Sequence, residues 1–197
     1  MPRLMPKHAS DIRAALEPYR DILLFVAAML LADGFWKLTV HGDEGKDSVA
    51  WLCFNLTPLF DTLARHTAGA VYALLQPFKP SLVLGSGLTL GYEGGSATHI
   101  AWSCTPVKQT FIFAVIMLTA RPYSPRKGAL HKLWFIPVGA GLVYVFNILR
   151  IAVVTLVIEE HPELFPLFHD HLLKYLFYGF IFLLWVLWTR IFGGKTV

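Results

Sequence analysis

The sequence contains few cysteines and few charged side chains. Cys53 and Cys104 are the two cysteines of the chain, and they form no CxxC pair or zinc-binding spacing. This count disfavours a disulfide framework, although a single disulfide stays open. There is also no nucleotide-binding loop, haem motif, metal-ligand cluster or nucleic-acid module, and we expect no cofactor.

The fraction of apolar residues is correspondingly high. Of the 197 residues, 55% are hydrophobic and 15% are charged, and the mean hydropathy is +0.55. These values are too apolar for an ordinary soluble domain and indicate a membrane protein. The length predicts one integral membrane domain over residues 1–197. The net charge of +4 reflects basic residues beside apolar segments, which favours a role in membrane orientation over nucleic-acid binding.

Long apolar runs predict an all-α polytopic membrane protein. About four transmembrane helices are expected, over residues 21–40, 106–120, 133–158 and 172–192. Arginine and lysine are frequent in 1–20, in 121–132 and in the tail, whereas 159–171 contains neither. The positive-inside rule therefore predicts a cytoplasmic N-terminal segment over 1–20 and a cytoplasmic C-terminus.

The region between the first two spans is predicted to lie outside the membrane. Apolar residues in 49–80 recur at helical spacing and predict an amphipathic helix on the outer face. The alternative is a pair of short spans broken at Asp61–His66, which would give six spans. The segments "LTLGY" and "THIAW" flank Glu93-Gly94-Gly95 and predict a short external β-hairpin.

Cys104 is the first candidate for catalysis. We expect Thr105 to cap a helix that begins at Pro106, which would put the thiol at the positive end of a helix dipole. Lys108 lies one turn further on. Both features favour the thiolate, the nucleophilic form of cysteine. The alternative is a small buried hydrophobic residue.

Arg150 is the second candidate, because it interrupts the most apolar run of the chain. Counted from both ends of 133–158, it is predicted in the outer third of the membrane, where an unpaired charge costs at least ~2.5 kcal/mol. Asn147 shares its helix face. Asp33 in the first span is at a similar depth, so an Arg150–Asp33 ion pair is the structural alternative.

The third candidate is a histidine at the outer end of the last span. His169 and His171 flank Asp170 there, and a neutral imidazole can act as a base. The predicted topology brings a thiol, a guanidinium and an imidazole to one membrane level. A Cys–His pair with a cation to stabilise an oxyanion is suited to acyl transfer.

At these residues the chain resembles the exosortase/archaeosortase family of membrane cysteine transpeptidases, in its compact bacterial form. The resemblance covers 103–192 and rests on "SCTPVKQ", "FNILRIA" and "FHDHLLKYLFYGFIFLLW". Many members have a small pair such as Ser-Gly after the cysteine, whereas Thr105-Pro106 follows here. The histidine assignment lies between His169, which we favour, and His171.

The resemblance implies an activity and a location. Cys104 would cleave the C-terminal sorting signal of an exported protein, with Arg150 stabilising the intermediate and His169 moving protons. The cleaved protein would pass to an unknown acceptor at the outer face of the bacterial cytoplasmic membrane.

Two other functions remain open at this point. One is a non-enzymatic assembly or export accessory protein in which Arg150 is a structural ion-pair residue. The other is an anion-conducting or lipid-phosphate-binding protein that uses Arg150 and Lys108.

Overall fold

Three helices dominate the computed structural model, which describes residues 17–43, 48–92, 95, 97–121 and 125–192. They are α2 (Arg20–Thr39), α5 (Pro125–Glu160) and α6 (Leu173–Phe192). Each contains a stretch that is long and apolar enough to cross a membrane. A short 3-10 turn, η1 (Glu17–Tyr19), precedes α2. The fold therefore points to a membrane protein.

The helix expected as the second span is shorter than predicted. It is α4 (Val107–Thr119), which has 13 residues and extends only about 20 Å. Its side chains Ile112, Phe113 and Met117 are fully buried at 0% exposure. They belong to a core formed together with α2, α5 and α6. Of the four expected spans, three have the required length, and α4 is the short inner helix of the bundle.

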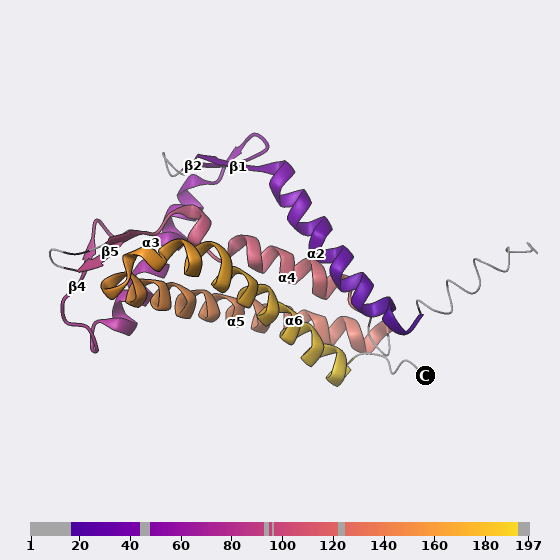
Figure 1. The fold of residues 1–197 in the computed structure, drawn as a ribbon. Helices are drawn as coiled ribbons and strands as arrows, with labels where there is room; N and C mark the ends of the chain where they lie inside the picture. Colours follow the sequence, from indigo (N-terminus) through magenta and orange to yellow (C-terminus); the bar gives the residue numbers. More distant parts are fainter. Residues whose placement is uncertain (1–16, 44–47, 93–94, 96, 122–124, 193–197) are drawn as a thin grey trace, which may run out of the picture.

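One end of the bundle gathers the start of α5 and the ends of α4 and α6 (Figure 1). The Lys132 ammonium donates hydrogen bonds to the carbonyl oxygens of Leu118 and Ala120, at 2.7 and 2.6 Å. His131 stacks on Phe192, with 4.2 Å between ring centroids. These contacts show that α5 begins at the end of the bundle where α4 and α6 finish. Most of the predicted cytoplasmic segment 1–20 lies outside the described residues.

Two small antiparallel sheets lie at the opposite end (Figure 1). Their strands are β1 (Val40–Asp43), β2 (Ser48–Trp51) and β3 (Phe54–Asn55), then β4 (Leu82–Gly85), β5 (Thr89–Tyr92) and β6 (Ala97–His99). The predicted hairpin is confirmed as β5–β6, in which Thr89 pairs with His99. The first sheet was not predicted, so "all-α" is too simple a description of the chain.

The amphipathic helix is confirmed as α3 (Thr57–Leu75). It runs without a break through 61–66, so the alternative of two short spans is wrong. Its position on the membrane surface is corrected, because its apolar face packs on protein. Ala64, Ala68 and Val71 are buried against α5 and the second sheet.

The last part of α5 is enclosed by these outer elements. Lys79, which follows α3, forms an ion pair of 2.6 Å with Glu159 near the end of α5. The Tyr92 hydroxyl donates to the Thr155 carbonyl at 3.3 Å. Burial raises the pKa of Tyr92 to about 12, and the nearby Glu159 carboxylate acts in the same direction.

After α5 come a 3-10 turn, η3 (Pro162–Leu164), and a π-helical segment, η4 (Leu167–Leu172).

Close contact between α4 and α5 depends on a glycine. A methyl group added at Gly139 would overlap the ring of Phe113, whereas one added at Gly141 would meet open space. We expect Gly139→Ala to lower the free energy of unfolding by about 1–3 kcal/mol, the usual cost of overpacking. Thermal unfolding in detergent measures the change. Gly141→Ala is the matched control and should leave the melting temperature equal or slightly higher; equal losses in both variants would contradict this packing.

Candidate functional site

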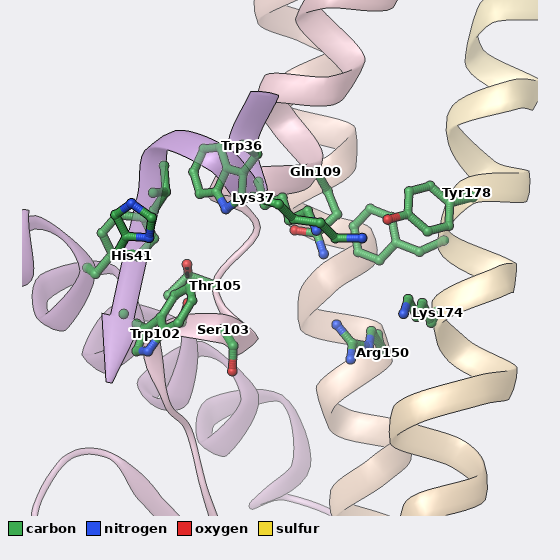
Figure 2. A pocket seen from close by; sticks show the side chains of 15 residues that line it. Trp36, Lys37, His41, Trp102, Ser103, Thr105, Gln109, Arg150, Lys174 and Tyr178 are labelled. Carbon is green, nitrogen blue, oxygen red and sulfur yellow. Dashed lines mark hydrogen bonds between the residues drawn. The ribbon is translucent and has the colours of Figure 1, made fainter. Parts of the chain in front are cut away.

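A cavity of about 570 Å³ lies where the bundle meets the outer elements (Figure 2). Each of the four bundle helices contributes one cationic side chain to its lining: Lys37, Lys108, Arg150 and Lys174. In Figure 2, Arg150 and Lys174 lie on one side of the cavity, and Trp102, Ser103 and Thr105 lie on the other. The cavity is therefore a strongly cationic space that also touches both neighbours of Cys104.

Asp33 is held by two of these lysines. Its two carboxylate oxygens accept ion pairs from Lys108 at 2.7 Å and from Lys37 at 2.8 Å. The carboxylate is 23% exposed, so it is mostly shielded from solvent. In place of the alternative Arg150–Asp33 ion pair, the carboxylate forms a Lys37–Asp33–Lys108 bridge between α2 and α4. Lys108, expected to favour a thiolate at Cys104, has Asp33 as its counter-ion.

Cys104 ends a 3-10 turn, η2 (Trp102–Cys104), just before α4. The predicted cap is wrong, because α4 begins at Val107 and the Thr105 hydroxyl donates to the Trp102 carbonyl at 2.7 Å. Cys104 is 8% exposed and packs in the apolar cluster beneath the second sheet. Its neighbours Ser103 and Thr105 line the cavity, whereas Cys104 itself does not.

Asn147 connects this turn to α5. Its side-chain amide donates a hydrogen bond of 2.9 Å to the carbonyl oxygen of Cys104, and Asn147 is fully buried. Ile151 and Ala152, which are also on α5, pack in the same cluster as Cys104. The cysteine is thus docked against the turns of α5 on either side of Arg150.

Arg150 lies where α5 leaves the four-helix bundle and begins to pack against the outer elements. It lines the same cavity as Lys174, near the start of α6, and Lys108, near the start of α4. From Arg150, α5 continues to Glu160, which is about 15 Å of additional helix.

The expected histidines are in a less regular segment. His169, Asp170 and His171 belong to the π-helical η4, shortly before Lys174. The positions of their side chains lie outside what the structure describes. A different histidine, His41 of β1, lines the cavity and was missed. The sequence feature that could have indicated this histidine is the run "VHG", which directly follows an apolar helix and precedes a polar turn.

Packing of η2 against β1 keeps His41 near the cysteine-bearing turn. The indole of Trp102 packs so closely on Gly42 that a methyl group there would overlap it. Trp102 also makes an edge-on contact with Phe60 of α3, with 6.2 Å between ring centroids. Aromatic packing of this kind holds β1, η2 and α3 around the cavity.

No family model, curated protein or solved structure matches the chain. Within the described residues, no group of three His, Cys, Asp or Glu side chains is placed to hold a metal ion. The arrangement offers a buried cysteine whose backbone is hydrogen-bonded to the helix that carries Arg150, together with a cationic cavity that His41 also lines.

The two cysteines differ in exposure, which predicts different reactivity. Cys53 is exposed, whereas Cys104 is buried. In folded protein, single-thiol variants should show Cys53 reacting with a polar maleimide at least about tenfold faster, because labelling of Cys104 requires local opening. Timed labelling of Cys104→Ser and Cys53→Ser measures the two rates. Denatured samples are the control and should label alike. Equal rates in folded protein would mean that the Cys104 thiol is freely reached.

Proposed function

We propose that the protein is a membrane-embedded cysteine peptidase or transpeptidase of the exosortase kind. The observation that carries the proposal is the buried hydrogen bond from Asn147 to the Cys104 carbonyl, at 2.9 Å. It keeps the cysteine-bearing turn beside the helix that carries Arg150. All three residues belong to the motifs on which the resemblance rests. Its substrate is an exported protein with a C-terminal sorting signal.

The chemistry follows from these side chains. The Cys104 sulfur attacks the carbonyl carbon of a peptide bond, and its proton passes to a histidine. A C–S bond forms while the negative charge on the carbonyl oxygen is stabilised by the Arg150 guanidinium. The carbonyl then reforms and the C–N bond breaks, with the histidine returning the proton to the leaving amine. An amine or hydroxyl of an acceptor, or water, opens the thioester and releases the thiol.

His169 is the histidine that we assign to proton transfer, with His171 as the alternative. Both histidines come shortly before Lys174 in the sequence, and the Lys174 side chain lines the cavity. The histidines therefore belong to the segment that leads into the cavity. The buried position of Cys104 adds a requirement. Substrate binding must rotate or uncover the thiol, because Ser103 and Thr105 line the cavity but Cys104 between them does not.

The orientation of the protein follows from the same proposal. The end of the bundle that carries the sheets and the cavity faces the outside of the bacterial cytoplasmic membrane, and both termini are cytoplasmic. The basic segments 1–20 and 121–132 are then on the inner side, as the positive-inside rule requires. An exported substrate would reach the cavity from the outer surface.

Loss of the thiol tests the enzymatic function. We expect Cys104→Ala to abolish processing of a co-expressed protein that ends in a sorting signal, because no other group supplies the nucleophile. Immunoblotting of the substrate measures processing, and membrane fractionation checks that the variant is inserted.

Cys53→Ala is the matched control for this test and should process normally, since Cys53 is exposed in the turn between β2 and β3. Continued processing by Cys104→Ala would contradict the peptidase proposal. It would favour the non-enzymatic accessory role.

The planar guanidinium of Arg150 is the second point of the proposal that can be tested. Arg150→Lys keeps the charge but loses the fork of N–H donors. If Arg150 stabilises an oxyanion, processing should slow by about a hundredfold or more, measured by time courses in membranes. Lys174→Arg, a charge-preserving change in the same cavity, is the control and should process at a normal rate. Normal processing by Arg150→Lys would restrict this residue to a structural charge.

A further inference from the structure

The cavity holds more positive charge than a peptidase mechanism uses. Lys37, Lys108 and Lys174 come from three different helices and line the same space as Arg150. Asp33 is the carboxylate that bridges Lys37 and Lys108. Asp33 offsets one of these positive charges, and the charge that is left, together with Lys174, would attract a further anion to the same space. We infer that Lys37, Lys108 and Lys174 form a binding site for the phosphate group of an anionic lipid headgroup or of free phosphate.

The lysines have the donors that such a ligand needs. An ammonium group carries three N–H donors, and Asp33 accepts from one on Lys37 and one on Lys108. Lys174 is exposed on the side of the cavity opposite Ser103 and Thr105 (Figure 2). Lysine binds phosphate as a mobile point charge, so a fixed fork geometry is unnecessary. The three lysines come from three different helices, so a phosphate would be approached from more than one element.

The volume of the cavity suits a headgroup. It measures about 570 Å³, which lies within the ordinary range of ligand pockets. Three aromatic residues, Trp36, Trp102 and Tyr178, line it and give the uncharged part of a ligand apolar surfaces to contact. A bare phosphate ion would fill only part of this space, which favours a larger molecule carrying a phosphate.

The level of the cavity along the bundle favours a lipid as the source. At the far end of the bundle His131 of α5 stacks on Phe192 of α6. At the near end Arg150 and Lys174, from the same two helices, line the cavity. The helical stretch between these levels is about 28 Å long, close to the ~30 Å of a hydrocarbon core. The lysines therefore lie where lipid phosphates begin.

The exposure of the lysines gives such a lipid a way in. The Lys37 side chain is 68% exposed and that of Lys108 is 27% exposed. A headgroup approaching from the rim of the bundle thus meets Lys37 and Lys174 first and reaches Lys108 deeper in the cavity. Because this site does not use the Cys104 thiol, it goes beyond the proposed function and does not depend on it.

Binding can be measured on the full-length protein in a neutral detergent. Thermal unfolding is followed while short-chain phosphatidylglycerol, short-chain phosphatidylcholine or inorganic phosphate is added. We expect phosphatidylglycerol to raise the melting temperature in a saturable way and phosphatidylcholine to have little effect. A similar rise with inorganic phosphate would identify free phosphate as the ligand, with the same lysines. No rise with either anion would overturn the site.

Variants then locate the binding. Lys174→Ala and Lys37→Ala should each weaken phosphatidylglycerol binding about fivefold, the effect of one lysine near an anionic surface. Lys174→Arg should bind normally because it keeps the charge. Arg190→Gln, at the opposite end of α6, is the matched control and should also bind normally. An equal loss in Arg190→Gln would overturn the site, because it would indicate general charge attraction.

The thiol variant separates this inference from the peptidase proposal. Cys104→Ser should bind phosphatidylglycerol like the original protein. Lipid binding that persists while the processing tests fail would leave the phosphate site in place and remove the peptidase. Processing that requires Cys104, with no anion binding by any variant, would do the reverse.

Discussion

The hydrogen bond from Asn147 to the Cys104 carbonyl joins the two parts of this protein. One part is the apolar bundle of α2, α4, α5 and α6, and the other is the outer layer of α3 and the two sheets. A buried amide and a buried carbonyl would each carry a desolvation cost of about 1–3 kcal/mol if left unpaired. Their pairing fixes where the turn before α4 meets α5. The position of the cavity follows from that contact.

The length of α5 makes this arrangement possible. Its first part packs in the bundle, and the part after Arg150 forms the surface on which the outer layer folds. The apolar face of α3 is thereby covered by protein. The Lys79–Glu159 ion pair links the segment after α3 to the C-terminal part of α5. The cationic cavity lies at the junction, where each bundle helix contributes a charge that its apolar interior could not accommodate.

The fold was largely readable from the sequence, because hydrophobic length and turn chemistry are local signals. The runs that became α2, α5 and α6 were predicted from composition alone, and Gly94-Gly95 marked the β5–β6 hairpin. The β1–β2 pairing was missed, since its strands are only four residues long and their alternation is weak. The sequence does not tell where α5 leaves the bundle and enters the outer layer, so it did not place Arg150 at that junction.

The sequence by itself determined that the chain is apolar and helical, and that a few polar groups, Asp33, Lys108, Asn147 and Arg150 among them, interrupt its helices. Only the tertiary structure decided how these groups are paired. The Asp33–Lys37 pair is local, because the two residues are one turn apart on α2, whereas the packing of α2 against α4 brought Lys108 to the other carboxylate oxygen. Likewise, Cys104 could have faced a cavity or a core. Packing of η2 beneath the second sheet turned it to the core, because side-chain direction depends on neighbours that are remote in sequence.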